Sequence, residues 1–332
     1  MRKKILHIGG TLNQATQMHQ IADELPEYDH FFSPQYSDGL LRVVQRWGWL
    51  DFTTPGRPWV ERIHQYIQSH HLQEDFGGES RDYDLTLIAT DLIVPKNILG
   101  EKIILVQEGM TDPETFLFYL VKWLPFLPRW LASSSTNGLS DAYDVFCVAS
   151  EGYRELFIQK GVRPEKIVVT GIPNFDNCKK FHHNTFPYHG YVLVCTSDSR
   201  ETFKFENRKK FIRQALEFAS GRQLIFKLHP NENIKRATKE IHTYAPGALV
   251  FAHGKVEEMV ANCDVLITQY SSVVFVGIAL GKEVYSYFDV QMLRRLLPLQ
   301  HASAARNIAS ICRQLLEEES IETTDPSMEM AS

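Results

Sequence analysis

The sequence lacks the cysteine patterns of disulfide-rich and zinc-binding proteins. Its five cysteines are scattered along 332 residues, and no two of them form a CxxC pair. An odd number without paired spacing argues against a disulfide framework or a structural zinc site and is typical of a reducing compartment. The opening residues, MRKKILHIGG, are apolar for only a few positions before two glycines. We therefore expect no signal peptide and a cytoplasmic protein.

An excess of positive charge and a membrane-spanning run are absent too. Lys and Arg number 35 against 40 Asp and Glu, a net charge of −5, so we expect no nucleic-acid partner. The apolar stretch 116–131, FLFYLVKWLPFLPRWL, is shorter than the about 20 residues that span a bilayer, and it contains Lys122 and Arg129. Two interpretations of this stretch stay open. It packs in the core or at a homodimer interface, or it contacts the inner face of a membrane peripherally.

Several catalytic motifs are missing as well. The sequence contains no GxSxG, no P-loop, no HExxH and no GxGxxG after its first predicted strand. These absences argue against a serine hydrolase of the nucleophile-elbow type, a P-loop enzyme, a zinc protease and a dinucleotide-binding enzyme. We expect neither a bound metal nor an organic cofactor.

Short runs rich in Val, Ile and Leu alternate with amphipathic segments along almost the whole chain. Such alternation predicts an α/β protein whose parallel strands are buried on both faces and joined by right-handed crossovers. We predict strands at 4–8, 29–32, 85–89, 103–106, 145–148, 167–169, 191–194, 224–227, 248–251, 265–267 and 284–287, and helices at 14–25, 151–160, 208–220, 256–262 and 304–318.

A polar, basic stretch, NCKKFHHNTFPYHG at 177–190, separates the two series of strands. It has no core pattern, so we interpret it as an interdomain linker. The expected architecture is two doubly wound Rossmann-like domains that face each other across a cleft. We assign residues 1–177 to the first domain, 178–190 to the linker, 191–319 to the second domain and 320–332 to a flexible tail.

Polar and titratable residues follow the predicted strands. In open parallel sheets, ligands bind outside the carboxyl ends of the strands, so these residues predict a shared binding site. In the first half they are Gly10, Asp91, Glu108 and Asn174, and in the second half they are Thr196, Ser197, Ser199, Lys227, His229, Pro230, His253, Ser271 and Ser272.

Three of these positions indicate phosphate and proton chemistry. Ser271 and Ser272 precede a predicted helix, where their hydroxyls cap the helix and its N-terminus attracts an anion; simple capping is the alternative. His229 at a strand end could donate to a phosphate oxygen, with structural packing as the alternative. Glu108 follows a buried strand and could take a proton from an acceptor hydroxyl, unless it serves as a capping or ion-pairing residue.

The run EGYRELFIQKGVRPEKIVVTGIPNFDN at 151–177 resembles a segment of UDP-N-acetylglucosamine 2-epimerases and CDP-glycerol glycerophosphotransferases. In that group a helix leads to a VTGxPxxD strand and loop. The order VLVCTSDSRE, LIFKLHPNEN and CDVLITQYSSVVFVGIALGKEVYSY is similar to the nucleotide-binding half of the same group. The resemblance covers most of 102–288. It implies the GT-B fold, with an acceptor-binding first domain and a donor-binding second domain.

Departures from the epimerase pattern bear on the activity. Epimerases carry a His-Arg pair where this chain has Ser197-Asp198-Ser199-Arg200, and Ser-Gly-Gly followed by Gln-Glu-Glu where it has Ser271-Ser272-Val273-Val274-Phe275. Both differences argue against epimerase activity, although Asp91 and Glu108 fall where that family keeps acidic catalytic residues.

A second resemblance is to bacterial sialyltransferases, polysialyltransferases and Kdo transferases. Their three short motifs are an acidic-acidic-Gly that carries the base, a His-Pro that contacts the CMP phosphate, and a Ser/Thr pair. Similar motifs here are Gln107-Glu108-Gly109, His229-Pro230 and Ser271-Ser272, with Gln107 departing from the first acid.

Together these resemblances imply a metal-independent glycosyltransferase. It would move a sugar or sugar-like group from a nucleotide-activated donor to a hydroxyl of a glycan or lipid-linked acceptor. Among the donors, the resemblances favour one that is linked to CMP or CDP. Glu108 would be the base, and His229 with Lys227 and the serine pair would stabilise the departing phosphate. The donor would be held by Gly10, Pro230, Thr196–Ser199 and residues 251–254, which include His253. Asp91 and Asn174 would lie on the acceptor side. The alternatives are an epimerase-like enzyme acting on a UDP-sugar and a non-catalytic nucleotide-binding module.

Overall fold

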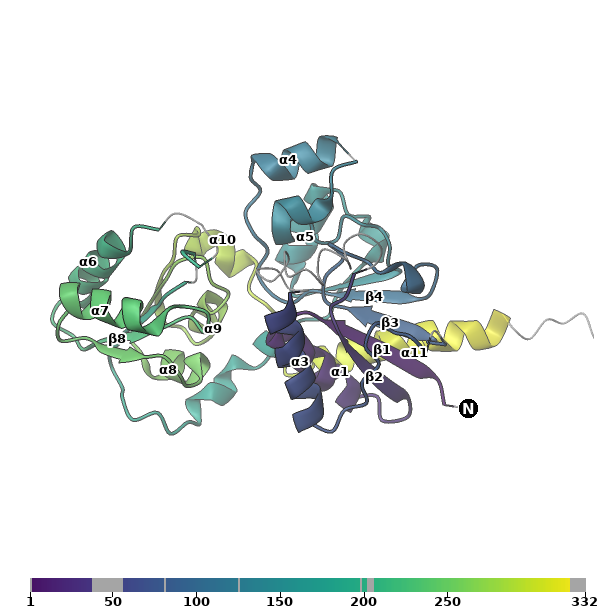
Figure 1. Cartoon of the computed structure of the whole chain (residues 1–332), viewed down its shortest axis with the longest axis horizontal. Coiled ribbons are helices and arrows are strands. Elements are labelled where there is room, and N and C mark those ends of the chain that lie inside the picture. Colours follow the sequence, from purple (N-terminus) through teal and green to yellow (C-terminus); the bar gives the residue numbers. More distant parts are fainter. Residues whose placement is uncertain are drawn as a thin grey trace, which may run out of the picture. The chain divides into compact units, whose positions relative to one another are not determined.

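The computed structural model describes residues 2–37, 56–80, 82–124, 126–197, 199–201 and 206–322. The chain divides into two compact units, drawn in sequence colours in Figure 1. The first unit takes residues 1–176 and 301–332, and the second takes residues 177–300. Each unit contains one parallel sheet, which confirms the α/β prediction.

The sheet of the first unit has six parallel strands in the order β2-β1-β3-β4-β5-β6. β1 pairs with β2 on one side and with β3 on the other, so the strand order reverses between β1 and β3. Continuous apolar runs form these strands because helices and loops cover both faces. Their bounds are β1 Lys4–Gly9, β2 Asp29–Pro34, β3 Leu85–Ile88, β4 Ile103–Val106, β5 Val145–Val148 and β6 Ile167–Val169.

One core cluster of this unit joins the sheet to three helices. α1 (Leu12–Asp23), α3 (Arg57–Ser69) and α11 (Ala304–Glu322) contribute buried side chains to it, such as Ile21, Ile63 and Ile308. α4 (Phe116–Trp123), α5 (Glu151–Lys160) and five short 3-10 turns complete the helical elements of the described residues before β7. The turns are η1 Lys96–Ile98, η2 Arg129–Thr136, η3 Pro164–Lys166, η4 Pro173–Phe175 and η5 Cys178–His182, the last of which belongs to the second unit.

The sheet of the second unit has five parallel strands in the order β11-β10-β7-β8-β9. The order reverses between β7 and β10, which marks the place where doubly wound sheets bind ligands. Helices α6 and α7 supply part of the core through Phe211 and Ile241. The strands are β7 Val192–Cys195, β8 Leu224–Lys227, β9 Leu249–Phe251, β10 Val265–Thr268 and β11 Glu283–Tyr285, and the helices are α6 Arg208–Ala219, α7 Ile234–Tyr244, α8 Val256–Asn262, α9 Val274–Ala279 and α10 Val290–Arg295.

All eleven predicted strands are present; four have the predicted ends, and the ends of the others differ by at most two residues. Period and composition were sufficient because each strand is short, continuous and apolar. The five cysteines are buried free thiols, as expected of a chain without a disulfide framework.

The C-terminal helix differs from the expected domain division. The sequence prediction placed residues 191–319 together, but α11 belongs to the first unit. Its Ile308, Cys312 and Leu316 lie in the core of that unit, and Lys102 Nζ donates to the carbonyl of Leu315 at 2.6 Å. An amphipathic pattern shows that a helix packs on a sheet, but it does not show on which one.

The stretch predicted as a linker is part of the second unit. It contains η5, and the Asn184 side-chain amide donates to Asn262 Oδ1 at 3.0 Å, which ties it to the end of α8. Of the predicted tail, residues 320–322 continue α11, and 323–332 lie outside the described residues. Among the described helices, none is long and apolar enough to cross a bilayer.

Candidate functional site

Glu108 lies two residues after the end of β4 in the first unit, at the carboxyl edge of the sheet. Its carboxylate accepts two hydrogen bonds, from Thr11 Oγ1 at 2.9 Å and from Gln14 Nε2 at 2.6 Å. Both donors belong to the start of α1, where Thr11 is the N-cap and accepts from the Gln14 amide at 3.2 Å. β1 and α1 come close enough for this because Gly9 has no Cβ, and one built there would lie 3.2 Å from Gln14 Cβ.

The surroundings of Glu108 favour its protonated form. Burial raises the pKa of the Glu108 carboxyl above its usual range, while the hydrogen bonds from Gln14 and Thr11 oppose that rise. Both donors are neutral, and no charged side chain of the described residues contributes to the shift. A half-buried carboxylate with a raised pKa and no cationic partner has the properties of a general base.

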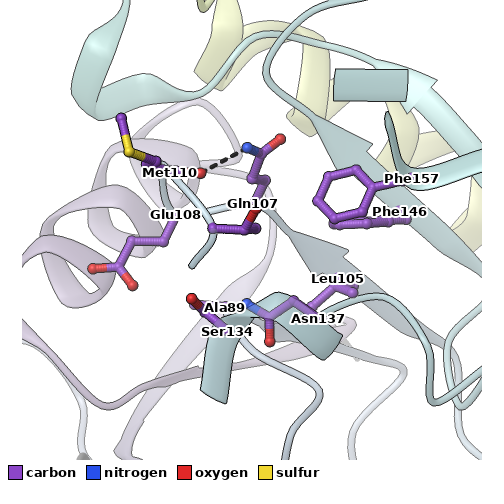
Figure 2. A pocket seen from close by; sticks show the side chains of 11 residues that line it. Ala89, Leu105, Gln107, Glu108, Met110, Ser134, Asn137, Phe146 and Phe157 are labelled. Atoms are coloured by element: carbon purple, nitrogen blue, oxygen red, sulfur yellow. Dashed lines mark hydrogen bonds between the residues drawn. The ribbon is translucent and has the colours of Figure 1, made fainter. Parts of the chain in front are cut away.

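A small pocket of about 110 Å³ lies beside Glu108 and is shown in Figure 2. The Glu108 carboxylate points away from Phe146 and Phe157, which form the apolar side of the view. Gln107, which departs from the acidic residue of the transferase motif, bridges neighbouring backbone instead. Its Oε1 accepts from the Ala149 amide at 2.9 Å, and its Nε2 donates to the Gly109 carbonyl at 2.7 Å. Gln107 therefore holds the turn on which Glu108 lies.

The other predicted residues of the first unit have structural contacts. Asp91 is buried, and its carboxylate accepts from Arg129 NH1 at 3.0 Å and from the amides of Gly138 and Ser140, both at 2.8 Å. Asn174 donates to the Asn13 carbonyl at 2.6 Å. These contacts occupy both oxygens of Asp91 and join Asn174 to α1.

Gly10, predicted to bind the donor, lies in the first unit and takes part in the support of Glu108. Its amide donates to Gln14 Oε1 at 2.6 Å, which orients the Gln14 side chain toward the carboxylate. Two successive hydrogen bonds, from Gly10 to Gln14 and from Gln14 to Glu108, therefore connect Gly10 to the carboxylate.

In the second unit, the loops after β7 and β8 meet at a buried carboxylate. Glu232 Oε2 accepts from the His229 amide at 3.0 Å and from the Thr196 hydroxyl. The Thr196 hydroxyl oxygen also accepts from the His229 amide, at 3.1 Å. Glu232 thereby fixes the backbone of the residue that carries the His229 ring.

Arg208, at the start of α6, neutralises this carboxylate. Its NH2 donates to Glu232 Oε1 at 2.6 Å and to the Ser197 carbonyl at 3.2 Å, and its Nε lies 2.7 Å from Glu206 Oε1. The side chain of Glu232 is 0% exposed and that of Arg208 is 4% exposed. Two carboxylates at ion-pair distance, those of Glu232 and Glu206, offset the loss of hydration of the buried Arg208 charge.

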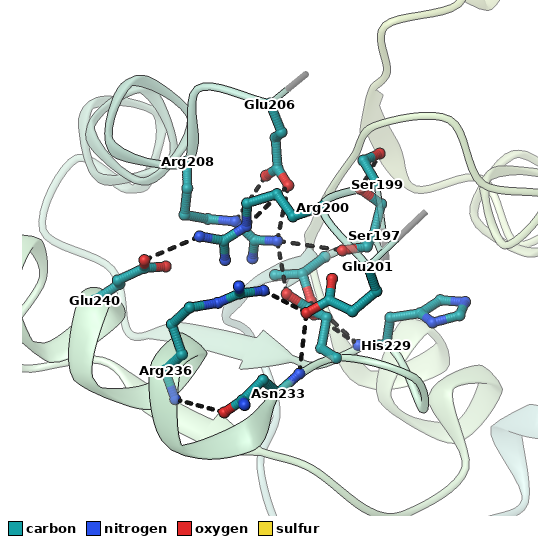
Figure 3. A network of polar contacts seen from close by, with 12 residues as sticks. Ser197, Ser199, Arg200, Glu201, Glu206, Arg208, His229, Asn233, Arg236 and Glu240 are labelled. Carbon is teal, nitrogen blue, oxygen red and sulfur yellow. Dashed lines mark hydrogen bonds and ion pairs between the residues drawn. The ribbon is translucent and has the colours of Figure 1, made fainter. Parts of the chain in front are cut away.

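Hydrogen bonds between side chains extend this network to the end of β10. Ser197 Oγ donates to Gln269 Oε1 at 2.7 Å and lies 2.9 Å from Ser199 Oγ, and Gln269 Nε2 donates to Glu206 Oε1 at 3.1 Å. Ser197 and Gln269 follow β7 and β10, the two strands between which the sheet order reverses. Figure 3 shows the arginine and glutamate side chains converging, with the His229 ring pointing away from them.

The His229 ring has a defined donor side. The Asn231 amide donates to His229 Nδ1 at 3.2 Å. A neutral imidazole whose Nδ1 accepts carries its proton on Nε2, so Nε2 is the atom that can donate to a ligand. Pro230, next in sequence, is exposed and lies in a turn in which the Glu232 amide donates to the His229 carbonyl at 3.0 Å.

Lys227 and the serine pair 271–272 make contacts that differ from those the sequence suggested. Lys227 Nζ donates to the carbonyls of Leu228 at 2.9 Å and Ala252 at 3.3 Å, so it joins the ends of β8 and β9; burial lowers its pKa. Ser271 and Ser272 do not cap α9, whose N-cap is Val273 without a side-chain hydrogen bond. Ser271 Oγ instead accepts from the Val273 amide at 3.4 Å, in a turn before the helix.

His253 is exposed after β9, and Asp198 of the predicted donor loop lies outside the described residues. Within the described residues, no group of three His, Cys, Asp or Glu side chains is placed to hold a metal ion.

Sequence reasoning missed Glu232, Arg208 and Gln269. Glu232 is the last residue of the run HPNE, and a glutamate in such a polar loop ordinarily faces water. Arg208 begins a helix rich in cations, which also predicts exposure. The only sequence signal for Glu232 was its proximity to His229, because its ion-pair partner Arg208 lies 24 positions away in the sequence.

No family model matches the sequence, and no curated protein matches it. Solved structures match almost the whole chain. S. aureus MnaA with UDP is 13% identical, covers 95% of this chain and 97% of its own, and has a TM-score of 0.57. The H444N variant of the wall teichoic acid polymerase TagF with CDPG is 12% identical, with coverage of 96% and 90% and a TM-score of 0.56. UDP-GlcNAc 2-epimerase from Neisseria meningitidis bound to UDP-GlcNAc is 13% identical, with coverage of 96% and 92% and a TM-score of 0.53.

These similarities show the fold. The chain has the GT-B fold of two Rossmann-like sheets, and its structural neighbours include the epimerases and the TagF polymerase that the sequence resemblance named.

Proposed function

We propose that this protein is a metal-independent glycosyltransferase that uses a nucleotide-activated sugar. The observation that carries the proposal is the environment of Glu108. Its carboxylate stands at the carboxyl edge of a sheet, is held by two neutral donors and has a raised pKa. A base in this condition can take the proton of an acceptor hydroxyl, which is the proton transfer that glycosyl transfer requires.

The donor half of the reaction belongs to the second unit. Solved structures with this fold hold UDP, UDP-GlcNAc or CDPG, which supports a nucleotide ligand here. His229 offers Nε2–H to a phosphate oxygen, from a backbone that Glu232 and Thr196 hold in place. A hydrogen bond to a phosphate stabilises the leaving group as its negative charge grows.

In the proposed reaction, the acceptor oxygen loses its proton to Glu108 and forms a bond to the anomeric carbon. The bond from that carbon to the phosphate oxygen breaks, and the nucleotide leaves with the electron pair. Thr196, Ser197 and Ser199 belong to the loop after β7 that would receive the donor. The serine pair 271–272 follows the neighbouring strand β10, and His253 follows the edge strand β9. The acceptor is a glycan or a lipid-linked glycan, in a pathway of cell-surface polysaccharide synthesis on the cytoplasmic side.

The second candidate is an epimerase-like activity on a UDP-sugar. It is favoured by the structures of UDP-GlcNAc 2-epimerases among the neighbours. The residues Ser197 to Arg200, in place of the epimerase His-Arg pair, weigh against it. A non-catalytic nucleotide-binding module is the third candidate, and turnover of any donor would exclude it.

A thermal-shift screen with CMP, CDP, UDP and GDP tests the donor assignment first. A ligand that binds only the folded protein raises the Tm by mass action. The nucleotide that binds is then supplied as its sugar conjugate, with and without a panel of glycan acceptors. Product that requires the acceptor supports the transferase, product from a UDP-sugar alone supports the epimerase, and binding of no nucleotide contradicts both.

A further inference from the structure

An exposed apolar surface surrounds α4 in the first unit. Seven of the eighteen large apolar side chains that are exposed in the described residues lie within 116–131. Phe116 is 77%, Trp123 84% and Phe126 78% exposed. We call this set the α4 surface, and it consists of Phe116, Leu117, Tyr119, Trp123, Phe126, Trp130 and Leu131.

Packing in the core explains only a small part of this segment. Phe118 and Val121 of α4 are buried in a small cluster with Ala132, against Leu127 and Leu139. That cluster attaches the helix to the unit through one face. The remaining aromatic side chains meet water, an arrangement that soluble surfaces rarely keep unless a partner covers it.

A larger pocket lies next to this surface. It encloses about 670 Å³, and its wall is mainly apolar, including Val121, Phe126 and Trp130. A volume of this size is typical of pockets that take small organic ligands. The pocket shares Phe126 and Trp130 with the α4 surface, so the two form one continuous apolar region.

The charges at the pocket wall are of one sign. Lys122, Arg129 and Lys160 line it, and no aspartate or glutamate does. Arg129 is paired with Asp91 at 3.0 Å, whereas Lys122 Nζ and Lys160 Nζ donate to backbone carbonyls at 2.9 and 3.0 Å. Lys160 is buried, and burial lowers its pKa, so its charge contributes little here. Lys122 is exposed, and within the described residues no carboxylate lies at ion-pair distance from its Nζ, so its positive charge remains to attract an anion.

We propose that the α4 surface binds an anionic lipid bilayer and that the adjoining pocket takes the apolar chain of a lipid. Trp and Tyr are favoured at membrane interfaces because their rings are apolar and their N–H and O–H groups reach water. The exposed Lys122 beside them complements anionic headgroups. The inference deepens the proposed function by identifying the acceptor as membrane-borne, yet lipid binding requires no turnover and can be tested separately.

Flotation with vesicles tests the surface without donor or acceptor. The whole chain is mixed with vesicles of equal parts phosphatidylcholine and phosphatidylglycerol, or with phosphatidylcholine alone. We expect the protein to float with the mixed vesicles, and Trp123→Glu/Phe126→Glu to lower the binding constant about tenfold or more. Lys122→Gln should lower it about fivefold and lessen its dependence on salt.

Leu216→Glu is the matched control, because Leu216 is an exposed leucine on α6 of the second unit. It should bind vesicles as the wild type does, and circular dichroism melting confirms that each variant is folded. Absence of wild-type flotation would overturn the inference, as would equal flotation of the double variant. A wild-type dimer in sedimentation analysis that Trp123→Glu converts to a monomer would assign the surface to a second copy of the chain instead.

Lipids with brominated acyl chains test the pocket. Bromine quenches tryptophan fluorescence on contact, and Trp130 lines the pocket. Trp123→Phe should be quenched more than Trp123→Phe/Trp130→Phe when both are bound to the same vesicles. Equal quenching of the two variants would show that no chain reaches the pocket. The lipid tests and the nucleotide screen are independent measurements. A negative result for lipid binding therefore does not contradict the proposed glycosyltransferase, and the reverse holds as well.

Discussion

Each unit has a glutamate in the loop that follows one of its strands, Glu108 after β4 and Glu232 after β8, and the two carboxylates have opposite surroundings. Glu108 is half-buried, accepts from the neutral groups of Thr11 and Gln14, and has a raised pKa. Glu232 is fully buried and accepts from Arg208, Thr196 and the His229 amide.

The difference teaches what decides the role of a carboxylate. The neutral donors Thr11 and Gln14 orient the Glu108 carboxylate, and the carboxylate can still accept and release a proton. The Arg208 guanidinium and the His229 amide both donate to Glu232, which thereby holds two loops together. The first arrangement suits proton transfer, and the second suits the positioning of His229.

The largest expected effect is on turnover when Glu108 is changed to Gln. The amide keeps the size of the side chain but cannot take a proton, so kcat should fall about 10²–10⁴-fold. Nucleotide affinity, measured by thermal shift, should stay within error of wild type. Glu114→Gln, an exposed acid of the same unit, is the control. Full activity of Glu108→Gln on an identified acceptor would remove Glu108 from the chemistry.

The second effect is on stability when Glu232 is changed to Gln. Arg208 then loses its fully buried carboxylate partner and keeps only Glu206, which should lower the free energy of unfolding by about 3 kcal/mol. Urea unfolding measures it. Glu240→Gln, which breaks a more exposed pair with Arg200, should cost under about 1 kcal/mol. Equal losses in the two variants would contradict the distinction drawn between the two glutamates.

The third effect is on nucleotide affinity when His229 is changed to Ala. Loss of a hydrogen bond to a charged phosphate costs about 1.5–3 kcal/mol, which weakens binding about tenfold or more. Titration calorimetry with the nucleotide that scores in the screen measures the Kd. His242→Ala, an exposed histidine on α7, should bind as the wild type does. Unchanged affinity in His229→Ala would place the phosphate elsewhere.

The smallest effect is on the pH profile when Gln14 is changed to Leu. The Gln14 hydrogen bond lowers the pKa of Glu108, so its removal raises that pKa further. The base must be ionised to act, and the acidic limb of kcat should therefore move to higher pH. Gln20→Leu on the same helix, which contacts Asn174, should leave the profile in place. A shift to lower pH would mean that another group controls this limb.

Much of the fold could be predicted from local pattern. Strands such as β4 and β10 are short apolar runs, and Glu151–Lys160 was predicted with its observed ends. Long-range choices could not be predicted in this way. α11 packs on the first unit, which no periodicity of the helix reveals.

The site was predictable only as a set of positions. The rule that ligands bind at carboxyl strand ends selected Glu108, His229 and Asp91 alike. Tertiary contacts then separated them, because Asp91 is occupied by Arg129 and two amides while Glu108 keeps neutral partners. Glu232 was missed because its partner Arg208 is distant in sequence.

By itself, the sequence determined the α/β class, the strands and the edges at which polar residues gather, since these depend on local composition and period. Only the tertiary structure decided which carboxylate is neutralised, which helix completes which core and which aromatic side chains of 116–131 remain exposed. Each of those outcomes depends on burial and on partners brought together from distant parts of the chain, because a charge or an apolar ring acquires its energy from the groups that surround it.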